Sequence, residues 1–413
     1  MSKIGHFCLI CPKINIKFLS PRSFRFLMRQ QKIIELEKKY IMQTYIRPNF
    51  VIDHGKGCYV FDKKGKKYID LVSGIATCPL GHGNKELANA VKKQIEKLTN
   101  PSNLYYSEQQ VLLAEKLVKL SKLDKCFFSN SGTESAEAAI KLVRKYTKKP
   151  GIISTKHGFH GRTFGGLSAT WKEKIRQPFK PLLSNFKHVD YGNAAAVEKA
   201  IGKNTGAVIV EPIQGEAGII VPPKGYLKNL REICDKHGIL LIVDEVQTGC
   251  GRTGKFFAYE HENIKPDIVM LAKGLANGIP IGATIAKEEI ASSFKSGDHG
   301  STFGGNPVAC AAANFTLDYI AKNKLIANAE KQGKYIVEKI SSLNFENVKE
   351  IRGKGLMIGI GVKANAKEIV KKCNEKGLLI NSPEDNTLRF LPPLIIDKNL
   401  IDEAIKILRK IIN

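Results

Sequence analysis

Short apolar runs alternate with amphipathic stretches through the middle of the chain. Five runs have the length of buried strands: KCFFSN, GIISTK, GAVIVEP, GILLIVDE and DIVMLAK. Helical patterns or linkers separate them. Upstream, apolar residues recur at helical spacing, as at Leu87, Val91, Ile95 and Leu98. This alternation predicts an α/β fold in which helices wrap a mostly parallel sheet.

The pattern changes on either side of this central region. From Tyr59 to Leu71, apolar residues flank a Lys-Lys-Gly-Lys-Lys turn, which predicts a β-hairpin. After about residue 315, helical patterns at Asn323–Ser342, Asn365–Lys376 and Lys398–Ile412 alternate with short apolar segments, which predicts a smaller α+β domain. The expected parts are an extension (1–40), a large domain (76–314) and a small domain built from two segments (41–75 and 315–413).

The charge of the chain raises the question of a nucleic-acid or membrane partner. The 413 residues carry a formal net charge of +26. The lysines are spread over the whole length without interleaved aromatic residues, which is typical of a solvated, lysine-rich surface. No apolar run approaches the ~18 residues that a membrane-spanning helix needs. We therefore expect a soluble protein without a nucleic-acid or membrane partner.

The cysteines and the N-terminus bear on the cellular compartment. The nine cysteines are odd in number and mostly lie in apolar segments, which favours reduced thiols and a cytoplasmic location. Cys8 and Cys11 form a lone CxxC without a second pair at zinc spacing, so we expect no metal site. Residues 1–34 hold seven basic and no acidic residues. They fit an organelle transit peptide, a basic tail, or a stretch upstream of a later start at Met28 or Met42.

Polar residues that suit a phosphate-bearing, flat ligand follow two of the predicted strands. Ser131-Gly132-Thr133 opens a helix after KCFFSN, and such a turn can hold a phosphate at the helix N-terminus. After GIISTK comes HGFHGRT, in which the Phe159 ring can stack on a flat ligand and the Arg162 fork can bind a carboxylate. The alternative readings are an ordinary helix cap and a turn with a surface arginine.

Two further strand ends carry a carboxylate and a lysine. A carboxylate at a buried strand end is costly without a cation or donor, and a protonated ring nitrogen would supply both to Asp244. Gln247 lies three residues on, within reach of the same ring; the alternative is a buried aspartate that caps the next turn. Lys273 ends the following strand. Phosphate site, aromatic ring, carboxylate and lysine, in this order, are what a lysine Schiff base to pyridoxal phosphate (PLP) requires.

The chain resembles a known enzyme family from about Tyr40 to its C-terminus. Six blocks are similar to the class-III, or ω-amino-acid, aminotransferases of PLP fold type I: SNSGTESAEAAIKLVRK, FHGRT, VEPIQGEAG, LIVDEVQTGCGRTG, LAKGLANGIPIGA and STFGGNPVAC. Within that family, MQTYIRP, GIATCPLGHGN and SNLYYSEQQVLLAEKLV look most like the acetylornithine aminotransferase group. The resemblance implies a large PLP-binding domain and a smaller α+β domain.

The resemblance also implies a set of cofactor-binding residues: Ser131, Gly132, Thr133, Phe159, Asp244, Gln247, Lys273 and Thr302. Lys273 would form the Schiff base and carry the proton at the substrate carbon, and Asp244 would keep the ring nitrogen protonated. Thr302 matches a residue that reaches the phosphate from the neighbouring subunit, so a homodimer is expected. Glu245 would support the residues that touch the cofactor.

Substrate-binding residues follow from the same resemblance. Arg389 matches the arginine that binds the carboxylate beside the reacting carbon of glutamate or 2-oxoglutarate. Glu216 matches a catalytic switch that pairs with Arg389 when the ω-amine donor is bound and swings aside for glutamate. Arg162 would hold the distal carboxylate of the ω-amine donor, with Tyr45 nearby.

The expected reaction is amino transfer between N2-acetylornithine and 2-oxoglutarate, a step of arginine biosynthesis. Ile75 stands where ornithine aminotransferases commonly carry tyrosine, which favours the acetylornithine group. Thr77, Cys78 and Pro79 depart from the group's usual AVNALGH pattern, which affects the acyl end of the pocket. Succinylornithine, N-succinyl-diaminopimelate, ornithine and 4-aminobutyrate remain alternative donors. An aminomutase or racemase would not need the switch at Glu216.

Overall fold

The structure, a computed structural model, describes residues 30–412 and contains two compact units that meet in sequence at Ile52 and Asp53. The described part of the first unit holds helix α1 (Gln30–Tyr40), which the sequence pattern did not predict. Within that unit, Arg47 forms an ion pair with Glu37 at 2.6 Å. Residues 1–29, with Cys8, Cys11 and most of the basic extension, lie outside the described residues.

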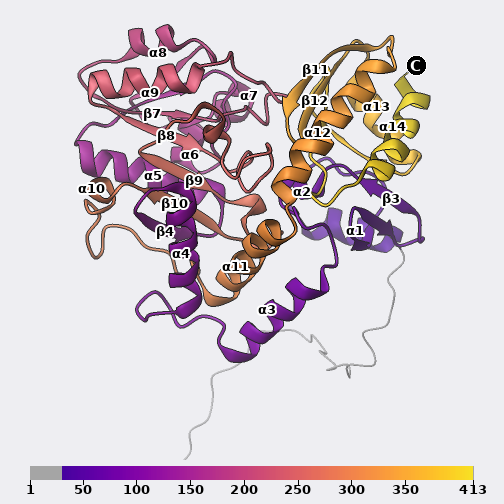
Figure 1. Cartoon of the computed structure of the whole chain (residues 1–413), viewed down its shortest axis with the longest axis horizontal. Coiled ribbons are helices and arrows are strands. Elements are labelled where there is room, and N and C mark those ends of the chain that lie inside the picture. The colour runs from indigo at the N-terminus through magenta and orange to yellow at the C-terminus, as the bar shows by residue number, and fades with distance from the viewer. Residues whose placement is uncertain (1–29, 413) are drawn as a thin grey trace, which may run out of the picture. The chain divides into compact units, whose positions relative to one another are not determined.

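The second unit contains three sheets and the remaining helices (Figure 1). Its strands are β1 (Ile52–Lys56), β2 (Tyr59–Asp62), β3 (Lys67–Asp70), β4 (Lys125–Ser129), β5 (Gly151–Thr155), β6 (Phe186–Val189), β7 (Thr205–Val210), β8 (Leu240–Asp244), β9 (Ile268–Leu271), β10 (Gly282–Ala286), β11 (Val348–Lys354), β12 (Met357–Val362), β13 (Leu378–Leu379), β14 (Asn381–Glu384) and β15 (Thr387–Phe390). Its α-helices are α2 (Ser73–Ala76), α3 (Lys85–Lys97), α4 (Glu108–Ser121), α5 (Gly132–Thr147), α6 (Phe164–Ala169), α7 (Glu173–Arg176), α8 (Ala194–Ala200), α9 (Tyr226–His237), α10 (Glu288–Ala291), α11 (Pro307–Lys322), α12 (Leu325–Ser342), α13 (Ala366–Glu375) and α14 (Lys398–Ile412). Short 3-10 helices are η2 (Gln177–Phe179), η3 (Ala258–Glu262) and η4 (Lys273–Ala276).

The central sheet has seven strands in the order β4-β10-β9-β8-β7-β5-β6. Neighbours from β9 to β6 pair in parallel, whereas β10 is antiparallel to both β9 and β4. The five apolar runs singled out in the sequence form β4, β5, β7, β8 and β9. The predicted α/β fold with a mostly parallel sheet is therefore confirmed.

Both faces of this sheet are buried. Along β7, Ala207 and Ile209 pack in one apolar cluster with α5 residues, whereas Val208 and Val210 pack in another with residues of α4, α9 and α11. This follows from the period of two, which sends neighbouring strand side chains to opposite faces. A strand that is covered on both faces needs an unbroken run of apolar residues, which is why these strands could be predicted from the sequence.

The two smaller sheets join distant parts of the chain. The predicted hairpin is confirmed as β2 and β3, and β13 then pairs in parallel with β3, with Leu378 beside Ile69. The other sheet has the order β11-β12-β15-β14. The predicted C-terminal helices are present as α12, α13 and α14, with ends shifted by at most two residues. The division of the chain at residues 76 and 314 stays a prediction.

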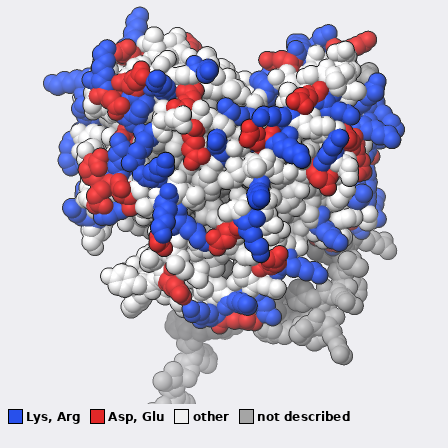
Figure 2. All heavy atoms as spheres, in the orientation of Figure 1, with Lys and Arg blue, Asp and Glu red and all other residues white. Residues whose placement is uncertain are grey.

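Charged side chains of both signs are mixed on the face of the molecule seen in Figure 2. Many of the lysines are in ion pairs, such as Lys119 with Glu115 at 2.5 Å and Lys125 with Glu288 at 2.7 Å. No helix among residues 30–412 is both long and apolar enough to cross a membrane. The seven cysteines of this part of the chain are free thiols.

The two carboxylates at the end of β8 separate because neighbouring side chains leave a strand on opposite sides. Glu245 is fully buried and accepts hydrogen bonds from the Tyr259 N–H, at 2.9 Å, and from the Thr248 hydroxyl. Burial raises the pKa of Glu245 to about 7. Glu245 therefore anchors the segment at η3. Its support of cofactor-contacting residues stays a prediction.

Glu245→Gln should flatten the pH dependence of stability between about pH 4.5 and 7. The folded protein keeps a proton on Glu245 up to a pKa of about 7, whereas the ordinary value is 4.5. This group therefore lowers stability as pH rises through that window, and its destabilising effect is complete above it. Glutamine resembles the protonated acid but carries no charge. Urea unfolding at about pH 5 and about pH 8 should differ less in the variant, by roughly 1 to 3 kcal/mol. An unchanged difference would contradict the prediction.

Candidate active site

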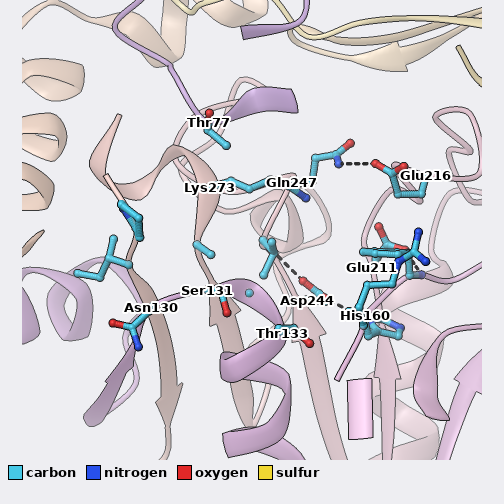
Figure 3. Close-up of a pocket in the computed structure, with 18 of the residues that line it drawn as sticks. Thr77, Asn130, Ser131, Thr133, His160, Glu211, Glu216, Asp244, Gln247 and Lys273 are labelled. Atoms are coloured by element: carbon cyan, nitrogen blue, oxygen red, sulfur yellow. Dashed lines mark hydrogen bonds and ion pairs between the residues drawn. The ribbon is translucent and has the colours of Figure 1, made fainter. Parts of the chain in front are cut away.

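A cavity of about 400 Å³ opens where several strands of the central sheet end (Figure 3). Its wall is built by the first turn of α5, the loop after β5, the ends of β7 and β8, and the segment after β9. The residues that line it are Thr77, Asn130, Ser131, Gly132, Thr133, Phe159, His160, Gly161, Arg162, Glu211, Glu216, Asp244, Val246, Gln247, Ala272, Lys273, Gly278, Ile279, Pro280 and Ile281. Ligand sites of parallel sheets lie at this edge.

The first turn of α5 is held by a capping box. Ser131 is the N-cap: its Oγ accepts the Glu134 N–H at 3.3 Å and donates to the Glu134 carboxylate at 3.0 Å. Glu134 also accepts the Asn130 N–H at 2.7 Å. The N–H groups of Gly132 and Thr133 have no acceptor inside the helix, so they are free to bind an anion. The Ser131 hydroxyl is engaged in the cap, and the role of Ser131 in cofactor binding stays a prediction.

Two glycines keep the backbone close together at this turn. Gly161 has a φ of 130°, and a Cβ there would lie 2.1 Å from Thr133 Oγ1. A Cβ on Gly132 would lie 2.7 Å from the Val246 side chain. The Thr133 hydroxyl is in turn hydrogen-bonded to the Thr163 hydroxyl at 2.7 Å. The space beside the first turn of α5 therefore depends on the absence of side chains at both positions.

Asp244, at the end of β8, is 4% exposed. One carboxylate oxygen accepts from Nδ1 of His160 at 2.7 Å, and the other accepts the Val246 N–H at 3.0 Å. Burial alone would lower the pKa of His160, but the hydrogen bond and charge of Asp244 outweigh it and hold that pKa above its ordinary value. Asp244 is thus fixed in direction and partly neutralised by neighbouring groups of the protein (Figure 3).

Lys273 follows β9 and begins η4, with its backbone in the left-handed region at φ 42°. Its ammonium has no hydrogen-bond or ion-pair partner in the described part of the chain. Burial lowers the pKa of Lys273, although the carboxylates of Glu216 and Asp244 act in the opposite direction. A lowered pKa makes the neutral amine more available, and the amine is the nucleophilic form of lysine.

Arg389 and Glu216 form an ion pair of 2.7 Å beside the cavity. Arg389 also donates to the Gly215 carbonyl at 2.9 Å and to the Asn381 side chain at 3.1 Å. Burial alone would raise the pKa of Glu216, but the Arg389 guanidinium holds it below its ordinary value. Gln247 donates to the same Glu216 oxygen at 3.4 Å. The predicted partners of the switch are therefore in contact.

Arg162 lies at the rim and is exposed, with its guanidinium carbon 5.8 Å from the centre of the Phe159 ring. No carboxylate pairs with Arg162 among residues 30–412. The cavity therefore presents one arginine covered by Glu216 and a second arginine open to solvent. A ligand with a carboxylate at its far end would find a free guanidinium at Arg162.

Three of the predicted site residues do not line the cavity. Arg389 lies behind Glu216. Thr302 is exposed, and its carbonyl accepts a hydrogen bond from Asn100 at 3.2 Å. Tyr45 is exposed and belongs to the first compact unit. Near the predicted acyl end, Thr77 lines the cavity, whereas Ile75 does not.

Three polar residues that line the cavity, Asn130, His160 and Glu211, had no role in the sequence interpretation. Glu211 directly follows β7, as Asp244 ends β8, so the rule that ligands bind at strand ends could have singled it out. His160 lay in a motif that was noticed, but its hydrogen bond to Asp244 crosses 84 residues of sequence. The local sequence pattern does not indicate such a contact.

The residues present fit PLP, a flat cationic ring with a phosphate. The first turn of α5 has free N–H groups, and glycines leave room beside it. Asp244 offers a fixed carboxylate to a ring nitrogen, and the buried Oε1 of Gln247 has no hydrogen-bond partner in residues 30–412. A buried polar atom without a partner is costly, which is a reason to expect a ligand group there. Lys273 supplies an unpaired amine.

Similar proteins carry names of one enzyme class. The chain is 48% identical to the acetylornithine aminotransferase of Archaeoglobus fulgidus over 91% of this chain and 99% of the relative. It is 51% identical to that of Methanopyrus kandleri over 90% of this chain and 96% of the relative.

Solved structures give the same class. The ornithine aminotransferase of Toxoplasma gondii superimposes with a TM-score of 0.91 at 32% identity, covering 95% of this chain and 96% of that one. The acetylornithine aminotransferase of Elizabethkingia anophelis has a TM-score of 0.84 at 35% identity, covering 93% and 98%. The family model described as aminotransferase class-III matches residues 40–412. The chain belongs to the class-III aminotransferase family, whose members depend on PLP.

Proposed function

We propose that this aminotransferase transfers the terminal amino group of N2-acetylornithine to 2-oxoglutarate, forming glutamate, as a step of arginine biosynthesis in the cytoplasm. The organelle alternative depends on residues 1–34 and stays open as part of the proposal. The observation that carries the proposal is the Glu216–Arg389 ion pair at the cavity. Such a pair suits an enzyme that carries out two half-reactions with unlike amino donors.

The pair allows one site to accept donors with and without a carboxylate beside the reacting carbon. Arg389 is 1% exposed, and removal of the acidic partner of a buried charge costs roughly 3 to 5 kcal/mol. When glutamate or 2-oxoglutarate enters, its carboxylate replaces Glu216 as that partner. When an ω-amine donor enters, Glu216 stays and keeps Arg389 neutralised.

The cofactor-handling residues have separate tasks. When bound, PLP supplies a carbonyl carbon and a ring that withdraws electrons. The Lys273 amine is proposed to hold the cofactor and to move the proton at the reacting substrate carbon. Asp244, fixed by His160, would hold a proton on the ring nitrogen. Gly132 and Thr133 would bind the phosphate, and Phe159 would stack on the ring.

Each candidate donor carries a carboxylate at the end away from the reacting amine. Arg162 is exposed at the rim without an acidic partner in residues 30–412, and we assign it the carboxylate of the acylated amino acid. Curated relatives named acetylornithine aminotransferase, at 48% and 51% identity, support N2-acetylornithine over the alternatives. Tyr45 remains a proposed contact on resemblance alone.

A homodimer, with Thr302 contributed to the partner's phosphate site, is part of the proposal. Large apolar side chains are exposed near Thr302: Leu104 (85%), Tyr105 (69%), Tyr106 (102%) and Phe303 (63%). The Asn103 side chain binds the carbonyls of Ser301 and Gly304, at 2.9 Å each, and so joins the two segments that carry them. Exposed apolar groups of this size favour burial against another surface, and a second copy would supply one.

The donor assignment is tested by single half-reactions. Purified PLP-form enzyme is mixed separately with N2-acetylornithine, N-succinylornithine, ornithine and 4-aminobutyrate, and the change in cofactor absorbance is measured. The reaction with N2-acetylornithine should be the fastest. The reason is the set of curated relatives named acetylornithine aminotransferase, since Arg162 could bind the distal carboxylate of any of the four donors. Faster conversion of another donor would keep the chemistry and reject the proposed substrate.

Glu216→Ala should favour glutamate over the ω-amine donor. Without Glu216, Arg389 lacks its partner unless a substrate carboxylate supplies one, so the ω-amine half-reaction should slow about tenfold or more relative to the glutamate half-reaction. Rapid-mixing rates for the two half-reactions measure this ratio. Equal loss in both would reject Glu216 as a switch.

Hybrid dimers test Lys273 and Thr302 together. Lys273→Ala and Thr302→Ala homodimers should each be strongly impaired. If Thr302 serves the partner, a hybrid of the two mutant chains contains one site with both wild-type residues and should regain about half of wild-type activity. Coexpression with two tags, tandem purification and a turnover assay give the result. A hybrid without recovery would place Thr302 outside the partner's site.

A further inference from the structure

Glu211 is a buried carboxylate of the cavity to which the proposed reaction gives no task. It is 5% exposed and follows β7 directly. Its two oxygens bind two different loops: one accepts the Phe159 N–H at 2.9 Å, and the other accepts the Gly215 N–H at 3.1 Å. Burial raises the pKa of Glu211 to about 7. Burial of an ionisable carboxyl group costs free energy, so the two hydrogen bonds of Glu211 require a structural or functional explanation.

Each of the two loops carries a separate part of the site. One loop presents the Phe159 ring to the cavity. The other continues from Gly215 to Glu216, and the Gly215 carbonyl accepts from Arg389 at 2.9 Å. Gly215 therefore links the two residues: its N–H binds Glu211 and its carbonyl binds Arg389. Through Glu211, the proposed ring-stacking residue and the proposed switch share one anchor.

The far end of the Glu216 loop is fixed independently. Gln214 and Ile220 exchange two backbone hydrogen bonds of 3.0 Å, which close a hairpin over 214–220. Arg352 donates from Nε to the carbonyls of Gly218 and Ile219 at 3.0 Å each. With Gly215 held by Glu211, the hairpin is fastened on both sides of Glu216. Glu216 can then leave Arg389 by rotating its side chain while the backbone stays in place.

We infer that Glu211 is a positioning residue that couples the Phe159 loop to the 214–220 hairpin and thereby holds Glu216 over Arg389. This inference rests on the proposed function, because it concerns the alternation of two donors at one site. It explains the presence of a carboxylate, because each of its two oxygens accepts one of the two N–H groups. It also predicts which properties change together when the bridge is lost.

The test compares wild-type holoenzyme with Glu211→Leu, which removes both acceptors at similar volume, and Glu211→Gln, which keeps one. Two quantities are measured: the rate ratio of the ω-amine half-reaction to the glutamate half-reaction, and the rate of cofactor release into a phosphate-free buffer. In Glu211→Leu the ratio should fall about tenfold and cofactor release should rise about tenfold, because one charge-assisted hydrogen bond is lost on each loop. Glu211→Gln should shift the ratio in the same direction, by a smaller factor.

Asp267→Asn is the control. Asp267 is as buried as Glu211, at 4% exposed, and its carboxylate also accepts one backbone N–H, that of Leu241 at 2.8 Å. It forms an ion pair with Arg231 at 2.7 Å and does not line the cavity. Its loss should lower the melting temperature and leave the ratio within twofold of wild type. A control that shifts the ratio as Glu211→Leu does would show that the ratio follows stability alone and would overturn the inference.

Other results would also overturn the coupling of the two loops. A ratio within twofold of wild type in Glu211→Leu, or unchanged cofactor release, overturns the coupling. If Glu211→Leu does not fold, an unchanged ratio in Glu211→Gln overturns it. The ratio uses whichever ω-amine donor reacts fastest with wild-type enzyme, so a failure of the proposed substrate is seen in wild type and is separate from a failure of the bridge.

Discussion

Arg389 carries its charge with 1% of its surface exposed, and a guanidinium so deeply buried needs an anionic partner in every state of the protein. Several elements of the fold meet this need. Strand β15 presents Arg389, and the 214–220 hairpin brings Glu216 within 2.7 Å. Gln247, from the end of β8, donates to the same carboxylate. The site is therefore built around a buried charge that needs an anionic partner.

The central sheet supplies the precision that this arrangement requires. Asp244 ends β8, Lys273 follows the adjacent parallel strand β9, and Glu211 follows β7 on the other side of β8. Because these strands are buried on both faces, their ends are fixed by packing on two sides. Neighbouring side chains hold the polar groups placed there, as the 2.7 Å contact between His160 and Asp244 shows.

The strands and the cluster of polar residues at their ends could be predicted from the sequence because buried parallel strands leave unbroken apolar runs. Roles for Lys273 and Asp244 followed from that order and from family resemblance. The local pattern could not separate Asp244 from its neighbour Glu245, since only tertiary contacts show that Glu245 binds Tyr259. The same holds for Ser131, whose hydroxyl is engaged by Glu134. The roles of Thr302 and Tyr45 stay predictions.

The parallel pairing of β3 with β13 has a consequence for how the chain acquires its structure. Leu378 lies beside Ile69, so the ribosome must make roughly three hundred further residues after β3 before its partner exists. All seven strands of the central sheet lie between these two points in the sequence. The sheet that carries most of the cavity can therefore form during synthesis. The β1-β2-β3-β13 sheet, with its very long loop closure, is expected to be completed late.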